Sequence, residues 1–239
     1  MGDKNAKGGA LAKEVCIILP ALNEEDAIGK VIDEIPRDEI ERRGYKAKIL
    51  VVDNGSRDRT GEIARGKGAE VIVEPLRGKG RALRAAFKSL SGDFVFVLDA
   101  DYTYPATHIP EMLDRLEDGY DVVIGSRLKG RMRRGAMSRL NLVGNRLLAL
   151  MTNTLYGTRI SDPCTGYWGF KQKVISGVEL NAVGFDIEAD LLTEIARDGC
   201  KITEIPIRYR RRTTPPKLNS LKDGFKIGRM LLRKKFRRR

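Results

Sequence analysis

Short apolar runs recur along the first half of the chain, and none of them contains a polar residue. They cover residues 15–19, 49–52, 71–73, 94–98 and 122–124. Runs without polar alternation are typical of strands that are buried on both faces. The segments between them have helical spacing and short connections, which indicates βαβ units. The pattern therefore predicts an α/β fold, with a mostly parallel sheet flanked by helices.

The pattern changes after residue 127, where basic residues follow one another without an acidic residue among them. They are Lys129, Arg131, Arg133, Arg134 and Arg139, and they predict a basic loop. Residues 138–157 then form an amphipathic helix. One face of it carries the apolar residues Leu140, Val143, Leu147, Leu150 and Met151, and the opposite face carries Asn141, Asn145, Thr152 and Asn153. A short strand near residue 167, a helix over 186–197 and an extended stretch over 202–209 complete this half.

The last segment has the composition of a basic amphipathic helix. Apolar residues form one stripe (Leu221, Phe225, Leu232, Phe236), and basic residues form another (Lys222, Lys226, Arg229, Arg233, Arg237). Such a helix is typical of an interfacial membrane anchor, and the alternative is a helix packed on the body with a solvated basic face. The predicted organisation is a disordered lead-in (1–13), one α/β domain (14–212) and this helix (213–239).

Composition adds a strong positive charge to this picture. The chain has 45 Lys and Arg against 32 Asp and Glu, a net charge of +13, which calls for an acidic partner such as nucleic acid, anionic lipid or a phosphorylated small molecule. The three cysteines are far apart, so neither a disulfide framework nor a zinc site is indicated, and a reducing cytosolic compartment fits. The lead-in lacks the apolar core of a signal peptide, and no apolar stretch is long enough to span a bilayer. We therefore expect a soluble or peripheral protein.

Two carboxylates follow the most apolar strand of the predicted sheet. Asp99 and Asp101 come directly after the run 94–98, at the carboxyl end where ligands bind in open α/β sheets. Residues two apart in extended chain share a side of the backbone. Mg²⁺ prefers one or two carboxylates together with substrate phosphates, so the pair indicates a metal–diphosphate site. The alternative is a strand-end turn without a ligand.

Several short motifs occur in a recognisable order. They are Pro20–Glu25, Asp53–Ser56, Gly78-Lys79-Gly80, the pair Asp99 and Asp101, and Gly125-Ser126-Arg127. In this order they resemble the family 2 glycosyltransferases, and more narrowly the branch that transfers a hexose from a nucleotide sugar to dolichyl or polyprenyl phosphate. The segments 162–170, 184–188 and 204–209 resemble the same branch. The resemblance implies a GT-A-type nucleotide-sugar-binding domain.

The resemblance also implies a donor site for a UDP- or GDP-hexose. Its residues would be Pro20, Leu22, Glu24, Asp53, Lys79, Asp99, Ala100 and Asp101. Asp99 and Asp101 would bind Mg²⁺ or Mn²⁺, with Thr103 as a further candidate ligand. Many mannosyl-transferring relatives carry Gln at the position of Thr103, and the Thr-Tyr-Pro variant looks more like archaeal relatives that use UDP-sugars.

The predicted acceptor explains the basic loop. A phosphate monoester is already mostly dianionic at neutral pH, so it needs no general base and needs cations that hold it beside the donor sugar. Arg127, Arg131, Arg133, Arg134 and Arg139 are the candidates for this role. The resemblance selects Arg127 and Arg139 as phosphate ligands, and with Asp101 as the catalytic set it implies a single displacement with inversion. We expect the enzyme on an anionic membrane surface, at the cytoplasmic face of the cell membrane.

Two rival interpretations remain at this point. A glycosyltransferase with a soluble or glycan hydroxyl acceptor would need a base near the sugar. A basic nucleic-acid-binding protein would fit the charge, but Asp99 and Asp101 at the ligand edge would repel phosphate unless a metal intervened, so no nucleic acid is expected. Asp162 and Glu188 fit either a place beside the acceptor or a structural hydrogen-bonding role.

Overall fold

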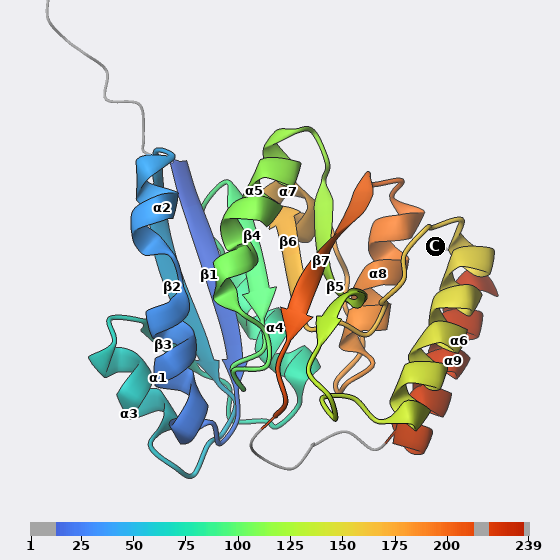
Figure 1. Ribbon diagram of the computed structural model, residues 1–239, viewed down its shortest axis with the longest axis horizontal. Coiled ribbons are helices and arrows are strands. Elements are labelled where there is room, and N and C mark those ends of the chain that lie inside the picture. Colours follow the sequence, from blue (N-terminus) through green and yellow to red (C-terminus); the bar gives the residue numbers. More distant parts are fainter. Residues whose placement is uncertain (1–12, 213–219, 237–239) are drawn as a thin grey trace, which may run out of the picture.

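The computed structural model describes residues 13–212 and 220–236, and its centre is one seven-stranded sheet (Figure 1). The strand order is β3-β2-β1-β4-β6-β5-β7, and β6 runs antiparallel to both of its neighbours while the others are parallel to one another. The strands are β1 (Lys13–Ala21), β2 (Tyr45–Asp53), β3 (Glu70–Val73), β4 (Phe94–Leu98), β5 (Val122–Met132), β6 (Tyr167–Lys171) and β7 (Ile202–Tyr209). The predicted mostly parallel α/β sheet is therefore confirmed.

Helices cover both faces of the sheet, because alternate side chains of each buried strand point to opposite sides. In β1, Ile17 and Leu19 belong to one core, and Cys16 and Ile18 belong to the other. The first core is closed by α1 (Glu25–Glu34), α2 (Arg37–Arg42), α3 (Thr60–Gly66), η1 (Ala106–His108) and α5 (Ile109–Glu117). The second is closed by α4 (Lys79–Lys88), α7 (Gln172–Ser176) and α8 (Ile187–Arg197).

The predicted basic loop is shorter than expected, because β5 continues through part of it. Beyond Ser126 the strand pairs again with β7, and Arg131 lies beside Arg208 after an irregularity in the register. Lys129 and Arg131 are therefore strand residues, and the prediction that they belong to a loop is wrong. The parallel partner strand supplies the hydrogen bonds that extend β5, and a partner so distant in sequence leaves no local signal.

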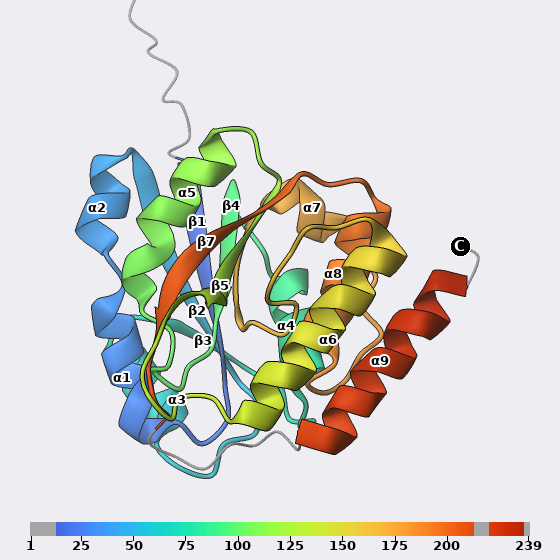
Figure 2. The ribbon, with the colours of Figure 1, turned by 45° about the vertical axis from the view of Figure 1, so that its right-hand side comes forward.

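Two long helices, α6 (Arg139–Tyr156) and α9 (Ser220–Phe236), lie side by side at one end of the sheet (Figure 2). Ile227 and Leu231 of α9 pack with Leu148 of α6 in a third, small core. On the α8 side, the Lys234 ammonium lies 2.7 Å from a carboxylate oxygen of Glu194. The α9 helix is thus packed on the body, and its most exposed apolar side chains, Phe225 and Phe236, remain at the surface.

The amphipathic helix α6 has the reverse of the usual orientation. Its apolar residues Leu140, Val143, Leu147 and Leu150 are between 52% and 63% exposed, whereas Asn145 and Thr152 are buried. Ser138 caps the helix at its start by accepting a hydrogen bond from the backbone N–H of Asn141, as the sequence boundary predicts. The apolar face therefore points outward, and Leu140 and Leu147 line one cavity together with Phe225 of α9.

In the part of the chain that the structure describes, no helix has the length and apolar character needed to cross a bilayer. The predicted lead-in lies outside the described residues except for Lys13, which begins β1. The side chains of Ser220 and Leu221 and the terminal residues 237–239 of the predicted basic helix also lie outside them.

Candidate active site

A cavity of about 1700 Å³ opens at the carboxyl ends of β1 and β4 and extends between α4, α6 and α9. It brings together most of the residues that the sequence assigns to the donor site. Those that line it are Pro20, Leu22, Glu24, Lys79, Asp99, Ala100 and Asp101, and Arg127 from the predicted acceptor site lines it as well. Seven basic side chains and four acidic ones line the cavity, so its charge suits an anionic ligand.

Asp99 and Asp101 lie at this edge because β4 ends at Leu98, and both face the cavity. The backbone N–H and the hydroxyl of Thr103 donate hydrogen bonds to one oxygen of Asp101, at 3.1 and 2.5 Å. Burial raises the pKa of Asp101 and the charge of Asp99 raises it further, while Arg212 opposes the shift. Asp99 fits because residue 166 is glycine, since a Cβ there would collide with its carboxylate. Thr103 itself is buried and lies outside the cavity lining, so its role as a metal ligand stays a prediction.

Lys79 enters the site at the first turn of α4, from a turn that two glycines permit. Gly78 has a φ of +141°, and a Cβ at Gly80 would collide with the carbonyl oxygen of Ala182. The Lys79 ammonium contacts Asp99 and lies 2.5 Å from a carboxylate oxygen of Glu188. Burial lowers the pKa of Lys79, but the attraction of the two carboxylates outweighs it, so the net pKa is raised. Lys79 is therefore charged and held between two acids.

Glu188 is the acidic residue of the cavity whose role the sequence left open. It lies in the first turn of α8 and is buried. Burial raises its pKa, and the opposing effect of Lys79 is the smaller of the two. The structure assigns this side chain to the same charge cluster as the predicted metal ligands.

Arg212 is a site residue that sequence reasoning missed. Its guanidinium donates a hydrogen bond of 2.7 Å to Glu24 and lies 3.2 Å from a carboxylate oxygen of Asp101. These partners are 188 and 111 residues away in the chain, so no local motif indicates the contact. The run Arg210-Arg211-Arg212 after the last strand was the only signal, and Arg211 lines the cavity as well.

Asp53 and its neighbour Asn54, at the end of β2, make different contacts, and only Asn54 lines the cavity. Asp53 accepts a hydrogen bond from the backbone N–H of Ser56, at 2.9 Å, and does not line the cavity. Asn54 does line it, and its side chain binds three backbone groups of the segment 74–78 at 2.7–3.1 Å. Asn54 thereby fixes the turn that carries Lys79. The nucleotide contact of Asp53 stays a prediction.

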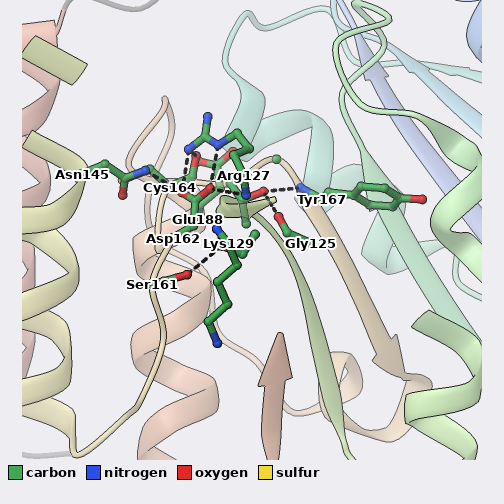
Figure 3. Close-up of polar contacts among 12 residues, drawn as sticks. Gly125, Arg127, Lys129, Asn145, Ser161, Asp162, Cys164, Tyr167 and Glu188 are labelled. Atoms are coloured by element: carbon green, nitrogen blue, oxygen red, sulfur yellow. Dashed lines mark hydrogen bonds and ion pairs between the residues drawn. The ribbon is translucent and has the colours of Figure 1, made fainter. Parts of the chain in front are cut away.

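Arg127 reaches the cavity from β5, but most of its hydrogen-bonding capacity is already used (Figure 3). Its Nε and Nη2 each donate to Asp162 at 2.7 Å, and Nη2 also donates to the carbonyl oxygen of Cys164. Asn145 of α6 donates to the same carboxylate. Burial lowers the pKa of Arg127, but Asp162 and other nearby groups raise it well above its ordinary value. Of the three guanidinium nitrogens of Arg127, Nη1 is the one that has no hydrogen-bond partner among the described residues. It is therefore the nitrogen available to a ligand.

The other arginines proposed for the acceptor phosphate are not brought to the cavity wall. Arg131, Arg133, Arg134 and Arg139 are exposed and are absent from its lining. The wall near them is built from Gly135–Ser138. These arginines flank that wall segment in the sequence, and their contact with a phosphate stays a prediction.

The two carboxylates, Asp99 and Asp101, are suitable ligands for a divalent metal that is bound together with a diphosphate. Across residues 13–212 and 220–236, no three His, Cys, Asp or Glu side chains form a ready-made metal cage. Two adjacent carboxylates facing an anion-binding cavity leave coordination positions for phosphate oxygens and water, which is how Mg²⁺ is usually bound.

Comparison with known sequences shows which proteins share these features. The profile described as "Glycosyl transferase family 2" matches residues 16–178. A "Dolichyl-phosphate hexose transferase" of Haloferax volcanii is 36% identical over 222 residues, which cover 92% of this chain and 93% of that protein. "Glycosyltransferase AglJ" of the same organism is 40% identical over 88% of this chain and 68% of its own length. A Pyrococcus furiosus "Dolichol-phosphate mannosyltransferase" is 30% identical, over 82% of this chain and 56% of its own length.

Solved structures give the same result. Glucosyl-3-phosphoglycerate synthase of Mycobacterium tuberculosis, in complex with Mn²⁺, UDP-glucose and phosphoglyceric acid, has a TM-score of 0.72 and 26% identity, over 92% of this chain and 77% of that one. The same enzyme with Mg²⁺ and UDP has a TM-score of 0.71 and 25% identity, over 92% and 77%. The predicted GT-A-type fold is confirmed, and the predicted ions, Mg²⁺ or Mn²⁺, are those that this relative binds. The family profile, the similar sequences and the fold agree, and the chain belongs to glycosyltransferase family 2.

Proposed function

We propose that this glycosyltransferase transfers a hexose from a nucleotide diphosphate-sugar to dolichyl or polyprenyl phosphate, with Mg²⁺ or Mn²⁺ as cofactor and with inversion of the anomeric carbon. One observation carries the proposal. A single cavity is lined by Asp101, whose side chain is 10% exposed, and also by the exposed apolar residues Leu140, Leu147 and Leu232. A cavity with a charged interior and an apolar mouth suits an acceptor that has an anionic head and an apolar chain. A relative similar over almost its whole length is named as a dolichyl-phosphate hexose transferase.

On the donor side, Pro20, Leu22, Glu24 and Asp53 would bind the nucleoside, and Lys79 would bind the diphosphate. Asp99 and Asp101, next to Ala100, would hold the metal, with Thr103 as a further candidate. The bound ion would supply positive charge that stabilises the departing nucleoside diphosphate. Relatives bind UDP-glucose or are named for mannose transfer, so the donor panel below includes both nucleotides.

On the acceptor side, Arg127 would bind the lipid phosphate through Nη1, and Arg131, Arg133, Arg134 and Arg139 would attract it to the entrance. The four acidic side chains that line the cavity are all engaged with Lys79 or Arg212. None of them is therefore held as a free base. A phosphate dianion can attack the sugar without a base, whereas a hydroxyl acceptor cannot readily do so. The ion pairing favours the phosphate acceptor.

The exposed surface of α6 and α9 would place the enzyme peripherally on a membrane, at the cytoplasmic face. The α6 sequence contains no acidic residue, and the described part of α9 contains only Asp223. Exposed apolar side chains on both helices are accompanied by Arg139, Arg229 and Arg233. Apolar side chains flanked by basic ones are the pattern expected for contact with anionic lipid.

A second candidate acceptor is a water-soluble phosphorylated acid. The observation that favours it is the structural likeness to a synthase that is seen with phosphoglyceric acid. Such an acceptor would use the same arginines but would not need the apolar mouth of the cavity.

The decisive experiment combines donor and acceptor panels. The full chain is incubated with Mn²⁺ and labelled UDP-glucose or GDP-mannose, with dolichyl phosphate, phosphoglyceric acid or an alkyl glucoside as acceptor. We expect label in the organic extract with dolichyl phosphate alone, and a β-linked product by NMR. Transfer to either soluble acceptor, with no lipid product from any donor, would overturn the proposed acceptor.

A further inference from the structure

The four acids that line the cavity form two pairs, and each pair is bridged by one basic side chain. Lys79 joins Asp99 to Glu188, with 2.5 Å between its ammonium and Glu188. Arg212 joins Asp101 to Glu24, at 3.2 and 2.7 Å. Both predicted metal ligands therefore already have a cationic partner from the chain itself.

Most side chains of these ion pairs are shielded from water, and the most exposed are Asp99, at 28%, and Arg212, at 23%. The side chain of Lys79 is 13% exposed and that of Glu188 is 9% exposed. Those of Asp101 and Glu24 are exposed to a similarly small extent, 10% and 6%. Charges in such places interact strongly, and leaving any one of them without a partner is costly. The site is therefore built to keep its acids neutralised at all times.

The two bridging cations come from different parts of the fold. Lys79 is fixed at the start of α4 by the hydrogen bond from Gly80 N–H to the carbonyl oxygen of Val183, at 3.0 Å. Arg212 follows β7, three residues after the last residue of that strand. Because both cations also line the cavity, each can reach an anion that enters it.

We propose that Lys79 and Arg212 are resident counter-ions of Asp99 and Asp101, and that they change partners when the donor binds. They would release the two carboxylates to the metal ion and take up the diphosphate oxygens instead. This inference rests on the proposed donor site, and it is independent of the identity of the acceptor.

Partner exchange makes the two ligands depend on each other. The metal alone would have to take Asp99 from Lys79 and Asp101 from Arg212. Each cation would then lose one of its two acidic partners and keep the other, Glu188 or Glu24. The diphosphate alone would meet the carboxylates without the metal that neutralises them. When both bind, every charge has a partner. The metal and the nucleotide should therefore bind with positive cooperativity, and each should raise the affinity of the other by the same factor.

The test measures Mn²⁺ binding to the full chain by electron paramagnetic resonance of the free ion, alone and with saturating UDP, and in a parallel series with GDP. Complexation of Mn²⁺ by the nucleotide in solution is subtracted. For the unsubstituted chain we expect Mn²⁺ to bind at least about tenfold more tightly with the matching nucleotide.

Two substitutions remove one counter-ion each, Lys79→Met and Arg212→Met. In each, Mn²⁺ alone should bind about tenfold more tightly, because one competing charge-assisted contact is gone. The factor by which the nucleotide improves Mn²⁺ binding should fall towards one. The matched controls are Lys88→Met, on the same helix as Lys79, and Arg208→Met, on β7. Both of these residues are exposed and lie outside the cavity lining, and each control removes one positive charge.

Lys79→Met leaves Glu188 buried without its partner, so the folding of this variant is checked by thermal unfolding. The double substitution Lys79→Met with Glu188→Gln removes both charges of the pair and provides a charge-balanced version. Equal Mn²⁺ affinity with and without a bound nucleotide would overturn the inference. So would variants that behave like Lys88→Met and Arg208→Met. If neither nucleotide binds at all, the proposed donor site fails together with the inference. A normal coupling without lipid transfer would support the inference and count against the proposed acceptor alone.

Discussion

The two ends of the cavity differ in how their charges are held. At the strand ends, Asp99 and Asp101 are partly shielded and are paired with Lys79 and Arg212. At the start of α6, Arg139 is exposed, and the same helix carries the exposed leucines Leu140, Leu147 and Leu150. One end is a neutralised polar interior, and the other is a basic and apolar surface.

The difference reflects the media from which the two proposed substrates come. A nucleotide sugar arrives from water, so its site can lie inside the fold, with its charges paired until the donor binds. A lipid phosphate arrives from a bilayer, and reaching it requires a surface that tolerates lipid on one side. Substitutions at the two ends should therefore change different properties of the enzyme.

The largest effect is expected at the inner end, for Asp101→Asn. The amide keeps the shape and can still accept from Thr103, but it has lost the charge that would hold the metal. We expect the transfer rate to fall by about 1000-fold, since metal stabilisation of the leaving group is worth several kcal/mol. Asp118→Asn, at an exposed position after α5, is the control and should be unchanged. Retention of more than a tenth of the activity in Asp101→Asn would exclude a metal role for this residue.

This inner end is the part that could be predicted from the sequence. Uninterrupted apolar runs identify buried strands locally, and Asp99 and Asp101 follow one of them directly. The parallel arrangement of the strands then places their ends at one edge. The alternation of strands and helices can be recognised from local sequence alone, so this half of the fold could be predicted.

What could not be predicted depends on contacts between distant residues. Arg212 meets Glu24 across 188 positions, and β5 is extended by its pairing with β7. Helical periodicity locates the apolar face of α6 but does not say which face is covered by the rest of the chain. Here Asn145 reaches the buried Asp162, so the polar face turns inward.

The next largest effect is expected for Arg127→Met, where the two ends meet. The substitution removes the cation proposed for the lipid phosphate and leaves Asp162 buried without its charge partner. We expect the KM for dolichyl phosphate to rise about 10- to 100-fold while the KM for the donor changes little. The free energy of unfolding should fall by about 3–5 kcal/mol, the usual cost of breaking a buried pair. Steady-state kinetics and urea unfolding measure the two effects.

The double substitution Arg127→Met with Asp162→Asn separates function from stability. It removes both charges, and Asn145 can still donate to the new amide oxygen. Stability should recover by more than half, because no buried charge is left unpaired. The weak use of lipid phosphate should remain. If lipid use recovers together with stability, Arg127 has a structural role and does not bind the acceptor.

A smaller effect is expected for Asn54→Asp, which again concerns the inner end. The Asn54 amide donates to the carbonyl oxygens of Glu74 and Leu76, and a carboxylate cannot donate to either. The turn that carries Lys79 should loosen, with a loss of about 1–3 kcal/mol in the free energy of unfolding and a donor KM raised about tenfold. Asn23→Asp makes the same change in charge where the side chain only accepts, from the Arg57 N–H, and should be nearly neutral. Equal donor KM values for the two variants would mean that Asn54 does not position Lys79.

The smallest effect is expected at the outer end, for Val143→Glu on α6. Val143 is 63% exposed and lies outside the cavity lining, so the substitution should leave stability and donor binding unchanged. Binding to vesicles that contain phosphatidylglycerol should weaken about fivefold, since one apolar contact with lipid, worth roughly 1 kcal/mol, is replaced by a negative charge. Val73→Glu is a close control, because Val73 is the same residue type, is 62% exposed and lies on β3. Equal loss of vesicle binding in both variants would show that net charge alone attracts the protein to lipid. A loss confined to Val143→Glu would show that the α6 face is the one that meets the bilayer.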